Sequence, residues 1–222
     1  MDNVEKAIKQ DREFTSAILR ALPGGMSVEE RQRWIGDLAG LQKGLRELLC
    51  PSNGDKVKKE GFSNPYLRLL YEGEHITLPV TGGQRLIADA KKVFTWGIDG
   101  DFRNWGADQP GEHRLQMEVK VLEMYQNATF SQMFNSFGKS LDELCFTQDQ
   151  IIAFCENHKD RLRRDGYGTF FLFKSNGKLF VARVIVDVDG RLDVSVFKFE
   201  DDDVWRSVDR RRVVVPATAL VA

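Results

Sequence analysis

The chain contains 222 residues, of which 42% are hydrophobic and 15 are Phe, enough apolar material for one or two folded domains. Its 32 Lys and Arg residues and 33 Asp and Glu residues give a formal charge of -1. A dedicated DNA-binding or membrane-surface protein normally shows a basic excess, so this balance argues against both classes.

The chain shows no recognisable export or membrane segment. Its start, from Met1 to Lys6, is charged instead of leading into an apolar signal-peptide core, and no stretch reaches the about 20 mostly apolar residues of a membrane span. Three cysteines, Cys50, Cys145 and Cys155, without a Cys-x-x-Cys pair, fit a reducing compartment. We therefore predict a cytoplasmic protein with small buried cysteines. A disulfide or metal pair between Cys145 and Cys155 is the alternative.

The first fifty residues have the apolar spacing of two helices. Residues 3–22 keep their apolar side chains on one face, and a capping-box pattern at Ser27 and Glu30 predicts a second helix directly after it. The second helix carries an apolar seam made by Trp34, Leu38, Leu41, Leu45 and Leu48. We predict an antiparallel helical hairpin over residues 1–50. It either docks on the rest of the chain or uses residues 3–50 for self-association or for binding a protein partner.

A polar, charged and turn-rich segment follows the hairpin. We predict a linker over residues 51–65 and a second domain over residues 66–222. Pro79 is expected to place its strand at a sheet edge. The elements expected next are two strands, a short helical or turn segment, and another strand, at residues 66–71, 75–81, 86–94 and 95–98.

The segment from Trp96 to Gly106 has the most unusual composition of the chain. Its candidate functional residues are Trp96, Asp99, Asp101, Arg103, Asn104 and Trp105. Asp99 and Asp101 form an Asp-x-Asp pair, which can hold a hard cation or divide acid and base roles, and the tryptophans can stack on a base or sugar. The alternative, which we favour, is an ordered loop. In such a loop the aspartates accept backbone N–H bonds and the tryptophans act as anchors.

Two helices are expected in the second half of the chain, over residues 129–137 and 147–162, and the second begins at an N-cap threonine. Cationic side chains crowd its end beside Tyr167. They are Lys159, Arg161, Arg163 and Arg164. We expect them to complement the helix dipole. A phosphate-contacting patch is the alternative, weakened by the carboxylates among the same residues.

The clearest strands lie near the C-terminus. Asn176-Gly177 and Asp189-Gly190 are strong hairpin turns, and the segments around them alternate apolar and polar residues. We predict a three-stranded meander and one later strand, at residues 168–174, 178–187, 191–199 and 213–216. The acidic residues 200–203 are expected to pair with the basic residues 210–212.

Motifs of common chemistries are missing. The sequence has no dinucleotide-binding glycine fingerprint, no phosphate-binding loop, no nucleophile elbow and no zinc-protease motif. The histidines, His75, His113 and His158, lie far apart and lack metal-ligand spacing. We predict no cofactor and no metal site, and we leave open a cysteine–histidine pair brought together by folding.

Several runs resemble a group of uncharacterised bacterial proteins associated with small-genome candidate phyla. The runs are Phe94-Thr95-Trp96 with Asp99, Asp101-Phe102 and Asn104-Trp105-Gly106, then Leu144-Cys145-Phe146-Thr147-Gln148-x-Gln150-Ile151, Asp165-Gly166-Tyr167-Gly168-Thr169-Phe170-Phe171-Leu172-Phe173-Lys174, and Arg212-Val213-Val214-Val215-Pro216. The resemblance covers roughly residues 76–216. It implies a bacterial, intracellular α+β protein and carries no activity, cofactor or catalytic residue.

We therefore predict an α+β fold: an N-terminal antiparallel helical hairpin, and a mixed domain with an antiparallel sheet, one main helix and a C-terminal three-stranded meander. Because no catalytic constellation is present, the favoured function is a non-enzymatic protein-interaction or adaptor protein that uses the hairpin and the tryptophan segment. The alternatives are a nucleic-acid-associated protein using residues 159–164 and 210–212, and a metal-assisted hydrolase using Asp99 and Asp101. No membrane partner is expected.

Overall fold

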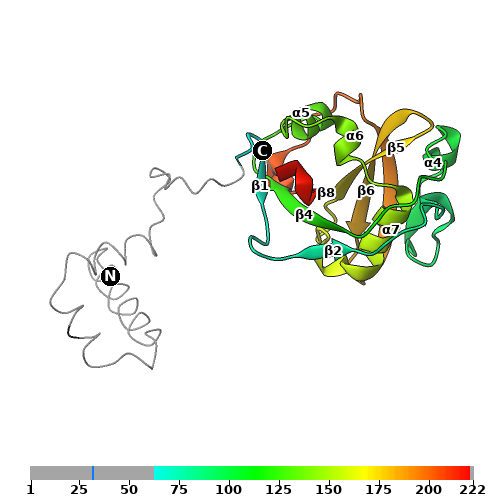
Figure 1. Ribbon diagram of the computed structural model, residues 1–222, viewed down its shortest axis with the longest axis horizontal. Coiled ribbons are helices and arrows are strands. Elements are labelled where there is room, and N and C mark those ends of the chain that lie inside the picture. Colours follow the sequence, from blue (N-terminus) through cyan, green and yellow to red (C-terminus); the bar gives the residue numbers. More distant parts are fainter. Residues whose placement is uncertain (1–31, 33–62, 221–222) are drawn as a thin grey trace, which may run out of the picture. The chain divides into compact units, whose positions relative to one another are not determined.

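The computed structural model describes Gln32 and residues 63–220 (Figure 1). The chain divides into two compact units, Met1–Lys59 and Glu60–Ala222, and nearly all described residues belong to the second. The predicted hairpin over residues 1–50 and most of the predicted linker lie outside the described residues. Within the described part of the chain, no helix is long and apolar enough to cross a membrane.

An eight-stranded sheet forms the centre of the second unit. Its strands in the described residues are β1 Leu67–Leu69, β2 Ile76–Leu78, β3 Gly97–Ile98, β4 Met117–Met124, β5 Thr169–Ser175, β6 Lys178–Val186, β7 Leu192–Lys198 and β8 Arg212–Pro216. Seven strands lie side by side in the order β1-β4-β8-β5-β6-β7-β3, and β2 also pairs with β4. The last strand in sequence therefore lies inside the sheet.

The predicted fold class is wrong in the sheet and in the helices. β8 runs parallel to β5 and β3 runs parallel to β7, so the sheet is mixed rather than antiparallel. The described residues hold four α-helices instead of one main helix: α4 Asp101–Asn104, α5 Phe130–Asn135, α6 Leu141–Leu144 and α7 Gln148–Asn157. Turn residues report which consecutive strands pair, but they carry no signal for a strand that returns after a long connection.

Four 3-10 helices complete the described elements: η1 Ile87–Asp89, η2 Lys159–Arg161, η3 Ser207–Asp209 and η4 Ala217–Leu220. η2 occupies part of the segment predicted as the end of the main helix. The predicted capping box at the start of α7 is confirmed. The hydroxyl of Thr147 accepts the N–H of Gln150 at 3.2 Å, and the Gln150 side chain accepts the N–H of Thr147 at 2.9 Å. The helix ends at Asn157, however, because His158 leaves helical geometry.

The strands β5, β6 and β7 pair antiparallel in succession. They turn at Asn176–Gly177 and at Gly190, where all three residues have positive φ angles. These strands belong to the mixed sheet and do not end an antiparallel one. On the far side, β1 and β2 pair with opposite ends of β4 and not with each other.

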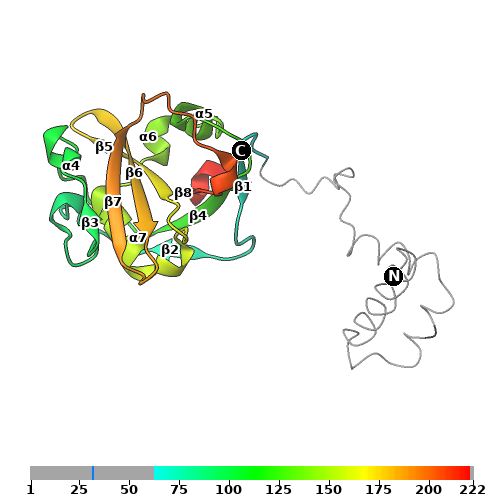
Figure 2. The same cartoon turned by 180° about the vertical axis from the view of Figure 1, so that it is seen from behind.

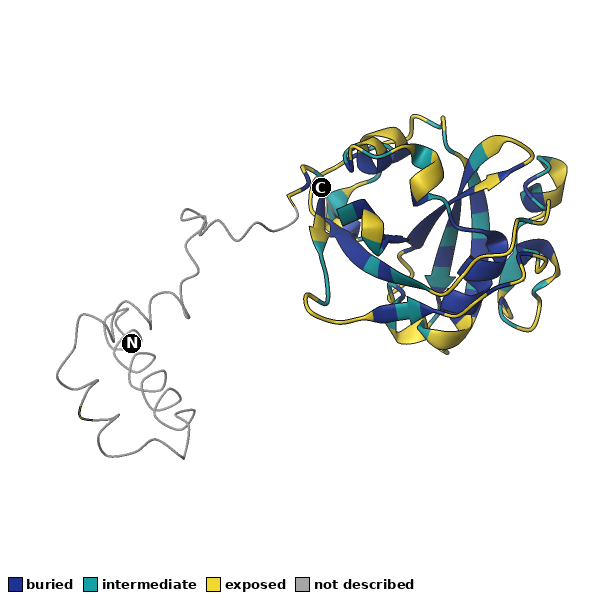
Figure 3. Cartoon of the chain, in the orientation of Figure 1, coloured by how far each residue is buried: buried dark blue, intermediate teal, exposed yellow. Residues whose placement is uncertain are grey.

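Both faces of the sheet carry a hydrophobic core (Figure 3). On one face, Phe171 of β5 packs against Phe154 of α7, with ring centroids 5.2 Å apart. On the other face, Phe130 of α5 packs against Phe170 and Trp205, each at 5.2 Å. Because neighbouring side chains on a strand point to opposite faces, Phe170 and Phe171 pack against helices on the two sides of the sheet.

Replacing Phe171 by alanine tests the first core. The ring is 1% exposed and touches Phe146 and Phe154. We expect Phe171→Ala to lower the free energy of unfolding by about 3–5 kcal/mol in denaturant titrations. Val188→Ala, at a side chain that is 99% exposed, is the control and should change it little. Equal stabilities of the two variants would contradict this packing.

Candidate functional site

The tryptophan segment uses its two aspartates to build local structure. Oδ1 of Asp99 accepts the N–H of Asp101 at 3.0 Å, and Oδ1 of Asp101 accepts the side-chain amide of Asn104 at 2.9 Å. These contacts form the turn into α4 and its first residues. Within the described residues, no group of three or more His, Cys, Asp or Glu side chains is arranged to hold a metal ion.

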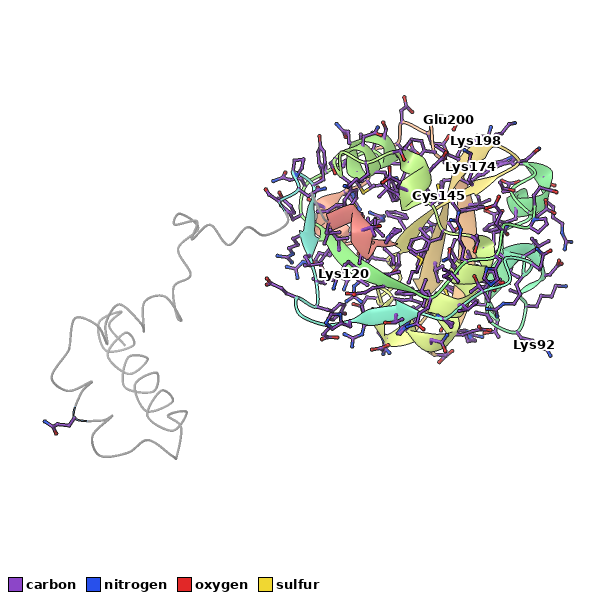
Figure 4. The ribbon with its side chains drawn as sticks, viewed as in Figure 1. Lys92, Lys120, Cys145, Lys174, Lys198 and Glu200 are labelled. Atoms are coloured by element: carbon purple, nitrogen blue, oxygen red, sulfur yellow. The ribbon has the colours of Figure 1, made fainter. Side chains whose placement is uncertain are left out.

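The other candidate residues of the tryptophan segment have separate contacts. Arg103 forms an ion pair with Asp89, and the Trp96 side chain is 51% exposed. Nζ of Lys198 lies 5.2 Å from the centroid of the Trp105 ring. A groove of about 510 Å³ adjoins this ring, and Figure 4 labels Lys198 and Glu200 among its residues. It is lined by Asn104, Trp105, Gly177, Lys178, Leu179, Phe180, Lys198, Phe199 and Glu200.

Arg161 and Arg163 of the predicted basic patch have different ion-pair and ring partners. Arg161 pairs with Glu74 at 2.7 Å, and its guanidinium carbon lies 4.3 Å from the centroid of the Tyr71 ring. Tyr71 packs against the core that contains α7. Arg163 instead pairs with Asp165 at 3.6 Å and lies 5.6 Å from the centroid of the Tyr167 ring.

The remaining residues of the predicted patch differ in exposure and in their contacts. Lys159 and Arg164 are exposed. Arg211 lies 6.0 Å from the Tyr167 ring, so this tyrosine is shared by one residue from each of the two predicted basic runs. The predicted pairing of residues 200–203 with residues 210–212 is wrong for Arg211, whose carboxylate partner is Asp209.

The structure groups residues that the sequence prediction did not connect. Along β7, and along β6 from Ala182 onward, side chains alternate between a buried face and a half-buried face. β7 runs along the front of the molecule in Figure 2. We call part of the half-buried face, with neighbouring residues on β3 and directly before β5 and β8, the arginine–aspartate face. It consists of Gly97, Gly168, Arg183, Ile185, Asp193, Ser195 and Arg211.

Strand register places five of these residues in one row across the sheet. In order they are Arg211, Gly168, Ile185, Asp193 and Gly97. Glycine weakens a strand and often marks a close approach by another group. A Cβ atom built on Gly168 would overlap Cγ of Arg183, and one built on Gly97 would overlap Oδ1 of Asp193. Both charged side chains therefore lie over glycine backbone.

Two arginines of this face have unused donors. Arg183 donates from Nη2 to Oγ of Ser195 at 3.0 Å, and its guanidinium lies 5.0 Å from the centroid of the Phe197 ring. Arg211 donates to Asp209 and lies 4.7 Å from the Trp205 ring. The Nε atoms of both arginines are buried, and no acceptor among the described residues bonds to them. Burial, and then the charge of Arg211, lower the pKa of Arg183.

Asp193 provides the only carboxylate of the face as defined. No described residue makes a hydrogen bond or an ion pair with this carboxylate. Burial, and then the charge of Asp99, raise its pKa, while Arg183 acts in the opposite direction. The face thus offers donors without acceptors at one end and an acceptor without donors at the other.

No protein-family model, curated protein or solved structure matches the chain. The resemblance to bacterial proteins over residues 76–216 therefore stays a prediction. The arginine–aspartate face was open to sequence reasoning only through its unusual strand residues. The signals were Gly168 at the start of a strand, the polar position Asp193, and Ser195 opposite Arg183.

Gly168→Ala tests whether Arg183 lies over this glycine. We expect the added methyl group to displace Arg183 and to lower the free energy of unfolding by about 1–3 kcal/mol, measured by denaturant titration. In an Arg183→Ala background the loss should shrink, because the overlapping Cγ is absent. Gly82→Ala is the control, since a Cβ there meets open space. The same loss in both backgrounds would contradict the contact.

Asp193→Asn tests the electrostatic cost of the unpaired carboxylate. Because its pKa is raised by folding, the ionised form destabilises the folded state at pH values above that pKa. We expect the variant to have the higher melting temperature at pH 7. The difference should vanish as the pH falls and Asp193 becomes protonated. The exposed Asp202→Asn is the control, and a less stable Asp193→Asn at pH 7 would refute the assignment.

Proposed function

We propose that this protein binds nucleoside phosphates, either free or within a single-stranded nucleic acid, at the arginine–aspartate face. The observation that carries the proposal is the pair Arg183 and Arg211, with Nε donors that have no acceptor in the described residues. Guanidinium groups match phosphate oxygens in charge and geometry. A phosphate between the two side chains would supply the missing acceptors after a small rotation of each.

The electrostatic balance supports an anion at this position. Arg183 is partly buried and lies near enough to Arg211 for the two positive charges to repel. Asp209 compensates Arg211, but Arg183 forms no ion pair with Asp193. An uncompensated charge in a partly buried site destabilises a protein, and a bound anion removes that penalty. The one or two phosphates that such a site holds require no basic excess over the whole chain.

Binding fits the described residues better than covalent catalysis. Burial, and then the charge of Asp142, raise the pKa of Cys145 to about 12. Burial also raises the pKa of Cys155. A thiol is a nucleophile only as its thiolate, so neither cysteine is activated, and a cysteine–histidine mechanism loses its support.

The adaptor hypothesis and the hydrolase hypothesis receive different support from the described residues. The adaptor hypothesis stays a prediction, because residues 3–50 lie outside the described residues. The groove beside Trp105 is the described feature that fits it. A hydrolase at Asp99 and Asp101 receives no support from their contacts, since both carboxylates accept hydrogen bonds that shape the turn into α4.

The proposal predicts direct binding of nucleotides to the full chain. Calorimetric titration with guanosine and adenosine 5′-monophosphates tests free nucleotides, and fluorescence anisotropy with a labelled single-stranded oligonucleotide tests a strand. We expect Arg183→Gln and Arg211→Gln each to weaken binding by about tenfold or more, as for a lost hydrogen bond to a charged group. Affinity should also fall as salt is raised.

Arg191→Gln is the matched control, because Arg191 pairs with Asp187 at the turn between β6 and β7 and lies outside the face. It should bind as the unmodified chain does. Melting curves of each variant separate a lost contact from a lost fold, and Arg183→Lys keeps the charge where Arg183→Gln does not. If neither nucleotides nor the oligonucleotide bind, or if Arg183→Gln and Arg211→Gln bind normally while folded, the proposal fails.

A further inference from the structure

We infer that Asp193 selects guanine among the nucleobases, an inference that rests on the binding of nucleoside phosphates proposed above. Three observations carry it. They are the position of Asp193 relative to the arginines, the unpaired state of its carboxylate, and the surface between them.

The row across the sheet sets the separation of the two ends. Arg211 lies beside β5 at one end, and Asp193 of β7 lies toward the other, with Gly168 and Ile185 between them. Neighbouring strands are about 4.8 Å apart, so three spacings place the two backbones about 14 Å apart. Arg183 extends over Gly168 from β6 and shortens the gap. A nucleoside monophosphate fits this length with its phosphate near the arginines and its base toward Asp193.

The surface between the ends suits a flat base. Ile185 pairs directly with Asp193 across the strands, and both side chains are half-buried. The adjoining position in the row is Gly168, and the aliphatic part of the Arg183 side chain lies over it. A base lying on Ile185, beside this part of Arg183, would cover the apolar side chain of Ile185 and displace water from it. Its edge would then face the carboxylate of Asp193.

The hydrogen-bond donors and acceptors on that edge determine which base the carboxylate selects. A carboxylate accepts two parallel hydrogen bonds, and guanine presents two adjacent donors, N1–H and the 2-amino group. Adenine and cytosine each present one amino group beside an acceptor nitrogen, which a carboxylate repels. Asp99 lies close enough to add negative charge, which strengthens the preference for donors. The Ser195 hydroxyl already accepts from Arg183 and takes no part in this choice.

The test compares three nucleotides on the full chain by calorimetry, at one pH and one salt concentration. We expect guanosine 5′-monophosphate to bind about tenfold tighter than adenosine 5′-monophosphate, as for one bidentate base contact. Inosine 5′-monophosphate keeps N1–H and lacks the 2-amino group, so it should lie between them. In Asp193→Asn the guanine preference should disappear while adenosine 5′-monophosphate binds at least as well. Asp202→Asn is the control and should keep the preference.

The outcomes separate this inference from the function on which it rests. Equal binding of all three nucleotides overturns guanine selection and leaves nucleotide binding standing. A guanine preference that persists in a folded Asp193→Asn variant overturns the role of Asp193. No binding of any nucleotide or oligonucleotide overturns both proposals.

Discussion

The parallel pairing of β8 with β5 brings the two arginines of the arginine–aspartate face to one end of that face. The N–H of Arg212 donates to the carbonyl of Gly168 at 3.2 Å, and this register places Arg211 beside Gly168. Arg183 reaches the same glycine from the opposite side, through the antiparallel pairing of β5 with β6. The arginine pair therefore forms only after the last strand has entered the sheet between β4 and β5.

One face of the sheet is buried over β5 and β8 but only half-buried over part of β6 and β7, and this difference creates the site. Phe130 of α5, together with Trp205, packs over Phe170, so side chains on this face of β5 and β8 are buried. The same face of β6 and β7 stays half-buried from Arg183 to Asp193. Had that region been covered by apolar packing, an arginine and an aspartate there would be strongly destabilising. Half-burial instead leaves both side chains partly exposed to solvent.

Local signals in the sequence predicted local structure well. The threonine and glutamine of the α7 capping box and the glycines of the two hairpin turns act within a few residues, so the sequence contains all the information they need. The favoured interpretation of Asp99 as a residue that accepts a backbone N–H is confirmed for the same reason. Strand β4 is absent from the prediction, because Met117–Met124 is rich in helix-forming residues and becomes a strand through pairing on both edges.

The candidate site depends on contacts that the sequence does not display. Arg183 lies on β6, whereas Gly168 and Arg211 directly precede β5 and β8, and β8 pairs with β5 in parallel after a long connection. The predicted basic patch grouped residues that are neighbours in sequence and so joined Arg161 to Arg163. In the structure Arg161 lies over the ring of Tyr71, whereas Arg163 lies over the ring of Tyr167. Arg211, which belongs to the predicted basic run 210–212, and Tyr167, which Arg163 and Arg211 share, link the prediction to the observed face.

The most direct measurement is a two-dimensional amide NMR titration of the full chain with guanosine 5′-monophosphate. If the ligand lies across the arginine–aspartate face, the shifted amides should cluster at Gly168, Arg183, Ile185, Asp193 and Arg211. Residues around the groove beside Trp105 should stay unchanged. Shifts confined to that groove, or no shifts at all, would contradict the assignment of the face as a nucleotide-binding surface.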